Sequence, residues 1–161
     1  MATAKLARLV DIYQQELDRF CRMRALAAEQ AQCVAASNFT VLNRILERRQ
    51  DLAEEIGGLS QQAQAVAQQL AADLGLPETN VSNLRQKLPE AAVAPLEQVL
   101  AQLGQVAEAI QEIDKESEAE LRRAMQGLRG EMSNVQRGQT AMRAYKNAPQ
   151  PNAARFLDEK K

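Results

Sequence analysis

Residues 42–70 read LNRILERRQDLAEEIGGLSQQAQAVAQQL, and this stretch decides the fold. Its repeating positions alternate strictly in steps of three and four: Leu42, Ile45, Arg49, Leu52, Ile56, Leu59, Ala63, Val66 and Leu70. A mean period of 3.5 residues is the heptad pattern of helices that wind around one another with a left-handed twist. About 30 residues, each rising roughly 1.5 Å, form a rod with long side surfaces and few pockets. Such a chain is better suited to binding than to catalysis.

The composition of the 161-residue chain favours the same architecture. Hydrophobic residues make up 45% and charged residues 25%, which is ordinary for one folded domain. The aromatic residues are Tyr13, Phe20, Phe39, Tyr145 and Phe156. With so few aromatics, the core must consist of narrow seams of Leu, Ile, Val and Ala. This is typical of a helical bundle and not of a barrel or sandwich.

The sequence contains no histidine. Histidine is the usual general base near neutral pH and the commonest ligand of protein-bound metals. No nucleophile–base pair or phosphate-binding loop is recognisable among the remaining polar residues. We therefore expect no enzymatic activity, no metal site and no cofactor.

The charge distribution argues against nucleic acid and membranes as partners. The net charge is −1, and the basic residues of 44–49 are followed at once by Asp51, Glu54 and Glu55. No basic stripe with aromatic residues is present to hold a phosphate backbone. No apolar stretch approaches 18 residues, and the N-terminus lacks a signal-peptide pattern. The sequence predicts a cytoplasmic protein without membrane insertion.

Cys21 and Cys33 lie twelve residues apart on one predicted helix. This places them roughly 18 Å apart along the helix axis, so they cannot form a disulfide within it. We expect them to be reduced and to pack as small hydrophobic residues. A reactive thiol or an intermolecular disulfide is the alternative.

The periodicity predicts a hairpin of two long helices. The first runs from about Ala4 to Ala35, and residues 35–38 reverse the chain because Ser37 or Asn38 suits a helix N-cap. The second helix ends at Gly75, two residues before a proline. Gly57-Gly58 either breaks this helix or weakens it; the seam keeps its phase across the pair, which favours a continuous helix.

A short connecting helix and a long last helix follow. Thr79 or Asn80 caps the short one, Pro89 closes it, and the last helix starts near Glu90 and tolerates Pro95 in its first turns. The predicted fold is all-α: an elongated antiparallel helical hairpin plus a long third helix, in a coiled-coil-like bundle with a short connecting helix. We expect residues 1–146 to form the bundle and residues 147–161 a flexible C-terminal tail.

The candidate site lies in the second half of the last helix. Its apolar face consists of Leu121, Met125, Leu128, Met132, Val135, Met142 and Tyr145, and three glycines interrupt the same stretch. Methionine side chains adapt to imperfectly matched partners, and glycines weaken a helix that nothing else holds. This face is therefore a candidate surface for a partner helix. Composition alone favours the alternative, in which these residues pack onto the hairpin as ordinary core.

Two further features each allow two interpretations. Phe156 and Leu157, which follow a proline-containing linker, either dock on a surface or belong to a disordered tail. Arg49 interrupts the apolar seam of residues 42–70. Such an arginine more commonly extends its charged head to solvent, but it can also pair with a carboxylate across the bundle and fix the register.

The layout resembles the FlgN family of flagellar export chaperones. The resemblance rests on the hairpin, the helix-ending Asp73-Leu-Gly75, the Leu84 to Leu88 segment before proline, and the long last helix. The most specific element is the ending, in which Tyr145 is followed after a short spacer by ARFLDEKK, residues 154–161.

This resemblance implies a chaperone that binds the C-terminal helical segment of hook-filament junction proteins. It would prevent their premature assembly and deliver them to the flagellar export gate or its ATPase complex. The implied binding residues are those of the apolar face named above, together with Phe156 and Leu157. The expected oligomeric state is a monomer or weak homodimer. The alternative is a structural coiled-coil protein that self-assembles through residues 42–70.

Overall fold

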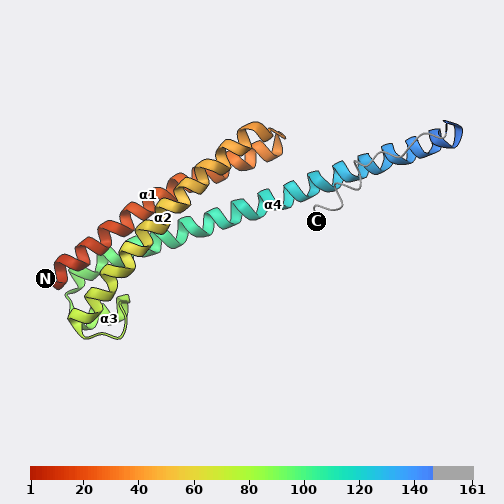
Figure 1. The fold of residues 1–161 in the computed structure, drawn as a ribbon. Coiled ribbons are helices and arrows are strands. Elements are labelled where there is room, and N and C mark those ends of the chain that lie inside the picture. The colour runs from red at the N-terminus through yellow and green to blue at the C-terminus, as the bar shows by residue number, and fades with distance from the viewer. Residues whose placement is uncertain (147–161) are drawn as a thin grey trace. The chain divides into compact units, whose positions relative to one another are not determined.

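The computed structural model describes the backbone of residues 1–146, and the side chains of residues 1–140 and of Met142. It contains four helices over these residues: α1 (Ala2–Ala35), α2 (Phe39–Leu74), α3 (Val81–Lys87) and α4 (Glu90–Lys146) (Figure 1). The described residues include no strand. The all-α prediction, with a hairpin, a short connecting helix and a long third helix, is confirmed. The chain divides into two compact units, Met1–Glu116 and Ser117–Lys161, which are described separately.

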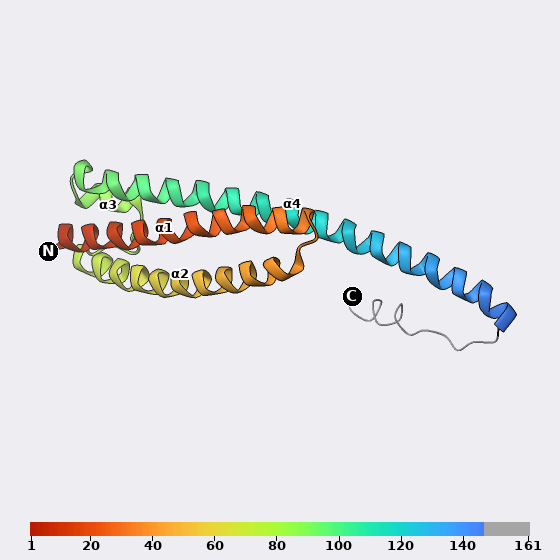
Figure 2. The same ribbon diagram turned by 90° about the horizontal axis from the view of Figure 1, so that it is seen from above.

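In the first unit, α1 and α2 lie side by side as an antiparallel hairpin (Figures 1 and 2). Two backbone bonds close the end of α1: the N–H of Asn38 donates to Cys33 O at 2.9 Å, and that of Ser37 to Val34 O at 3.2 Å. Ser37 adopts the left-handed conformation that this closure requires, with φ of 54°. The Asn38 side chain then accepts from the Val41 N–H at 3.4 Å. The reversal at residues 35–38 is confirmed, with Asn38 as the N-cap.

Helix α2 is continuous across Gly57 and Gly58, as the unbroken phase of the seam predicts. All nine seam residues are buried or partly buried, while most of the residues between them are exposed. The helix ends at Gly75, whose φ of 66° is left-handed. The N–H of Leu76 donates to Ala71 O at 2.9 Å, which satisfies a carbonyl at the helix end.

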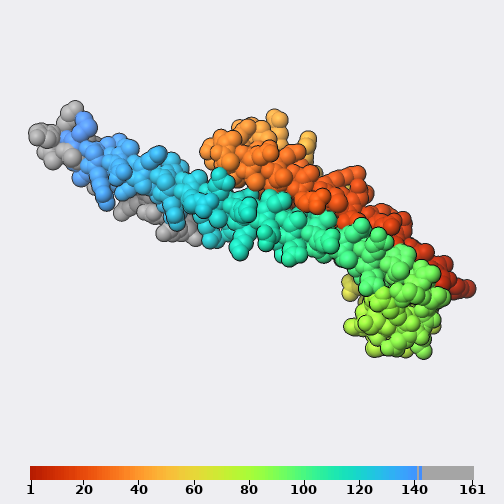
Figure 3. All heavy atoms as spheres, turned by 180° about the vertical axis from the view of Figure 1, so that it is seen from behind, coloured from red at the N-terminus to blue at the C-terminus, as the bar shows by residue number. Residues whose placement is uncertain are grey.

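The segment between α2 and α4 is held by local hydrogen bonds. The Asn80 side chain caps α3 by accepting from the Asn83 N–H at 2.8 Å, and the Thr79 hydroxyl donates to Ala67 O at 2.6 Å. Thr79 thereby ties the connection to α2. Figure 3 shows the α3 region gathered beside the first turns of α4. Helix α4 begins at Glu90 and includes Pro95, as expected.

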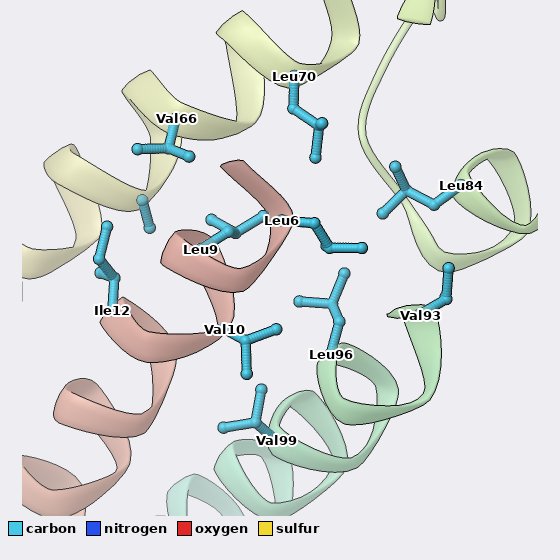
Figure 4. Packing of buried hydrophobic residues seen from close by; sticks show 11 residues of the cluster. Leu6, Leu9, Val10, Ile12, Val66, Leu70, Leu84, Val93, Leu96 and Val99 are labelled. Atoms are coloured by element: carbon cyan, nitrogen blue, oxygen red, sulfur yellow. The ribbon is translucent and has the colours of Figure 1, made fainter. Parts of the chain in front are cut away.

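The main core lies where all four helices meet. Figure 4 shows its side chains pointing toward one another from α1, α2, α3 and α4. Its buried residues are Leu6, Leu9, Val10, Ile12, Ala63, Val66, Leu70, Leu84, Val93, Leu96 and Val99. A second cluster joins α1 to α4 through Met23, Ala27, Val106 and Ile110. Because each fully buried large aliphatic side chain contributes about 1.5–3 kcal/mol, these clusters fix α3 and the first part of α4 onto the hairpin.

Arg49 joins three helices within the first unit. Its guanidinium donates to both carboxylate oxygens of Asp114 on α4, at 2.8 and 2.7 Å, and to Gln30 Oε1 on α1 at 2.5 Å. Its Nε lies 3.2 Å from the sulfur of Met23. The Arg49 side chain is only 17% exposed. The pairing interpretation is therefore confirmed, and the commoner solvent-directed conformation is wrong here because a planar guanidinium matches a carboxylate in two parallel bonds.

Glu16 is a buried carboxyl that the sequence pattern did not indicate. The residue is 6% exposed, and its Oε1 has no hydrogen-bond partner among the described residues. Burial raises the pKa of Glu16 above its ordinary value. Burial also raises the pKa of Tyr13, and the charge of Glu16 adds to that effect. This part of α1 thus holds a carboxyl in surroundings that favour its neutral form.

Candidate protein-binding surface

The described part of the second unit is the final stretch of α4, residues 117–146. Six apolar residues lie along one face of this stretch, and we call them the methionine stripe. They are Leu121, Met125, Leu128, Met132, Val135 and Met142. Successive members are three, four or seven residues apart, which is the spacing that places side chains on one side of a helix.

Most of the methionine stripe is exposed. The exposed fractions are 44% for Met125, 50% for Leu128, 58% for Val135 and 60% for Met142. Leu121 and Met132 are partly buried. These values describe the second unit by itself, and packing of these residues onto the hairpin stays the alternative to a binding surface. Single exposed hydrophobic residues are common, whereas an aligned series on one helix face is a candidate interaction surface.

Three other predicted site residues lie wholly or partly outside what the structure describes. The backbone of Tyr145 belongs to α4, but its side chain is outside the described residues. Phe156 and Leu157 are outside them entirely. The predicted docking of Phe156 and Leu157, and the predicted tail of residues 147–161, therefore stay predictions.

The glycines around the stripe have room for a side chain. A Cβ added to Gly127, Gly130 or Gly138 would meet no neighbouring heavy atom within 4 Å. No close packing against a described neighbour therefore accounts for these glycines. Each lowers the stability of a helix interior by about 1 kcal/mol relative to alanine. The candidate surface accordingly lies on a helical stretch of low intrinsic stability.

The first unit offers a second surface feature, a hollow between α1 and α2. Its volume is about 360 Å³, and its lining combines apolar side chains with charges of both signs. The lining residues are Arg22, Ala25, Leu26, Arg48, Asp51, Leu52 and Glu55. No nucleophile with an adjacent base is among them, so the lining suggests no catalytic chemistry.

The described residues contain neither a metal-binding cluster nor a membrane-spanning helix. No group of three or more His, Cys, Asp or Glu side chains there is arranged to hold a metal ion. No described helix is both long and apolar enough to cross a membrane. Cys21 and Cys33 are free thiols with partly buried side chains.

A match to a protein family establishes to which proteins this chain is related. A family model described as FlgN protein matches residues 1–153, which include all four helices and the whole methionine stripe. The chain belongs to the FlgN family. FlgN proteins are flagellar export chaperones, and they bind substrates of flagellar export. Searches of curated proteins and of solved structures gave no match.

The FlgN match ends immediately before the closing segment of the chain. Residues 154–161, which carry the most specific element of the sequence resemblance, lie outside the matched range. The family assignment therefore rests on the helical part of the chain.

Proposed function

We propose that this FlgN-family protein is a cytoplasmic chaperone of hook-filament junction proteins and has no catalytic role. In this proposal it binds their C-terminal helical segments on the methionine stripe. The exposure of Met125, Leu128, Val135 and Met142 along one helix face is the observation that carries the proposal. Export substrates that assemble through amphipathic helices need such a complementary apolar face to cover them before assembly.

The chemistry of the stripe suits recognition of a helix. An incoming amphipathic helix places its apolar residues between those of the stripe, in the way that knobs fit into holes in coiled coils. Methionine adapts to small differences between partners because its side chain is unbranched and flexible. The same surface would therefore accept related junction proteins without complete shape matching.

The glycine content of this helical stretch supports a mechanism for release. Gly127, Gly130 and Gly138 together lower helix stability by roughly 3 kcal/mol. If binding must also order this stretch, part of the contact energy is consumed by ordering. The affinity then remains low enough for the substrate to pass to the export gate.

A calorimetric titration with a peptide from the C-terminal end of a junction protein of the same organism tests the binding step. We expect one-to-one binding by the full chain and none after truncation at Arg123, with the hairpin still folded by circular dichroism. Undiminished binding by the truncated protein would contradict the proposal.

Two single substitutions sharpen this test. Leu128→Ser changes an exposed residue of the stripe, and Leu46→Ser changes a residue of similar exposure on α2 in the first unit. Truncation of a residue at the centre of an apolar interface commonly weakens binding tenfold or more. We expect that loss for Leu128→Ser and unchanged affinity for Leu46→Ser. Equal effects would show that the stripe is not the binding surface.

We further propose that Tyr145 contacts the export gate or its ATPase complex. This residue lies near the end of α4 and precedes Phe156 by eleven positions in the sequence. Tyr145→Ala is expected to weaken the interaction with the export machinery while substrate binding persists. A normal interaction of this variant with both export components would count against the assignment.

A further inference from the structure

The two edges of the methionine stripe differ in chemistry. In the heptad register of the stripe, one edge consists of the residues that follow Leu121, Leu128, Val135 and Met142. They are Arg122, Arg129, Gln136 and Arg143, and we call them the arginine edge. The opposite edge consists of Ala124, Glu131, Gly138 and Tyr145. Residues at these flanking positions of a helix pair set the choice and orientation of the partner helix.

The arginine edge has little compensating charge on its own helix. Arg122 pairs with Glu118 at 2.6 Å, but both side chains are more than 60% exposed, so the pair contributes little. The Nε of Arg129 has no hydrogen-bond partner among the described residues. Residues 117–146 contain six basic and three acidic residues, although the whole chain has a net charge of −1. The surface beside the stripe is therefore locally positive.

The same pattern disfavours a second copy of the chain as the occupant. If two stripes paired in antiparallel orientation, the two arginine edges would face each other and repel. In parallel orientation each arginine edge would face the other edge, where Arg122 would meet Ser117, one heptad before Ala124, and Arg129 would meet Ala124. Neither arrangement gives the arginines a carboxylate partner. Two copies of the stripe would therefore pair without the ion pairs that fix partner and orientation in coiled coils.

We infer that the stripe takes an amphipathic helix with a row of acidic residues along the edge that faces Arg122 and Arg129. This inference rests on the proposed function and specifies the chemistry of the substrate segment. Carboxylates in that row would pair with the guanidinium groups while the apolar residues cover the stripe. The charges would also raise the association rate and disfavour helices with a basic edge. These effects on rate and specificity are expected to exceed the effect on the final affinity.

Two synthetic peptides test the inference with the full-length protein. Both would carry the same apolar residues in heptad spacing, one with Glu and the other with Lys at every flanking position. By calorimetry at low ionic strength, we expect the Glu peptide to bind about tenfold more tightly, because the charges that pair with Arg122 and Arg129 in one complex are replaced by repelling charges in the other. The ratio should fall toward one as salt screens these exposed charges.

A matched pair of charge-reversal variants tests whether the arginine edge causes the preference for the Glu peptide. Arg122→Glu with Arg129→Glu reverses charge on the arginine edge, and Arg123→Glu with Arg137→Glu makes the same change on the opposite face of the helix. The first variant should prefer the Lys peptide, whereas the second should keep most of its preference for the Glu peptide. Circular dichroism would verify that both variants retain the helix content of the parent.

The outcomes separate this inference from the proposed function. Equal binding of the two peptides, or equal effects of the two double variants, would overturn the acidic-edge inference and leave the stripe as a binding surface. Full binding of both peptides by Leu128→Ser, or binding of neither peptide by the parent protein, would overturn both proposals.

Discussion

Arg49 illustrates how one polar residue can specify the packing of several helices. Its bonds to Asp114 and Gln30, and its contact with Met23, fix α1, α2 and α4 at one level of the first unit. A hydrophobic residue at this seam position would pack in several registers. The bidentate pair permits one register, because displacing α4 by one residue would separate Arg49 from Asp114.

We predict that Arg49→Met lowers the free energy of unfolding by about 1–2 kcal/mol, since Asp114 then loses its partner. Arg85→Met is the control, because Arg85 pairs with Glu90 and Glu97 on an exposed surface and its loss should cost less than the loss of Arg49. Urea unfolding of both variants measures the difference. Equal losses would mean that the buried position of Arg49 has no energetic importance.

Glu16 gives the first unit a component of stability that depends on pH. Because burial raises the pKa of Glu16, the folded state holds its proton to a higher pH than the unfolded state does. The folded state therefore binds more protons in the range from the ordinary carboxyl pKa to the raised one. Through this group, stability is greatest below that range and falls as pH rises across it.

We therefore predict that Glu16→Gln raises the free energy of unfolding at pH 7 by about 1 kcal/mol, because no buried charge remains. The gain should disappear at a pH below the ordinary carboxyl pKa, where Glu16 is neutral in both states. Glu29→Gln, at an exposed position of the same helix, is the control. Chemical unfolding at several pH values tests this, and a pH-independent gain would contradict the explanation.

At the scale of elements, helix α2 was predictable and α1 only partly so. The seam of residues 42–70 covers most of α2, and every residue of the seam is buried or partly buried. Helix α1 packs against both α2 and α4, so its buried face is wider than one stripe. One stripe in steps of three and four, through Leu6, Leu9, Tyr13, Leu17, Phe20, Met23, Ala27, Ala31 and Val34, therefore omits Ile12, Glu16 and Leu26, which the structure buries. A seam in one helix does not reveal how many neighbours that helix has.

Gly58 within α2 and Gly75 at its C-cap show two different effects of glycine. Gly58 lowers helix propensity, whereas Gly75 allows a left-handed backbone conformation. A Cβ added to Gly58 or to Gly75 would meet no atom within 4 Å, so space does not distinguish the two positions. Gly58 is helical, whereas Gly75 has a φ of 66°. We predict that Gly58→Ala stabilises the protein by about 0.5–1 kcal/mol and that Gly75→Ala destabilises it by about 1 kcal/mol. Thermal unfolding of both variants would test this, and changes of the same sign would refute it.

The final stretch of α4 allows helix stability to be changed without altering the stripe. Gly127 and Gly130 lie away from the stripe in its heptad register, and both have room for a methyl group. If binding orders this stretch, Gly127→Ala with Gly130→Ala should raise helix content and tighten peptide binding about tenfold, because less energy is spent on ordering. Circular dichroism and calorimetry measure the two effects. Higher helix content at unchanged affinity would exclude coupled ordering.

At the scale of the whole molecule, the candidate site was less predictable than the fold. The periodicity identified the apolar residues of 121–142, but the same pattern fits a helix that packs and a helix that binds. The choice depends on the exposure of Met125, Leu128, Val135 and Met142, and exposure is a property of tertiary structure and not of local pattern. The partner of Arg49 was equally inaccessible, since Asp114 is 65 positions away along the chain.

The burial of the α2 seam bears on the alternative function as a self-assembling coiled coil. A scaffold would use residues 42–70 to contact other chains. Here Leu42, Ile45, Ala63, Val66 and Leu70 are each at most 8% exposed within a single chain. Their apolar surface is already removed from water, so a second chain would gain little by contacting them.

We therefore predict a monomer or weak dimer by light scattering at increasing protein concentration. A polar substitution at a buried seam residue such as Val66 would disturb the fold itself, so the exposed Leu128 is the better position for a variant. Any weak dimer that forms through the stripe should dissociate in Leu128→Ser, while the monomer keeps its fold. A stable dimer unaffected by this substitution would instead indicate that α2 exchanges partners between chains. In that case the seam of residues 42–70 would be an interface, and the structural coiled-coil function would displace the chaperone proposal.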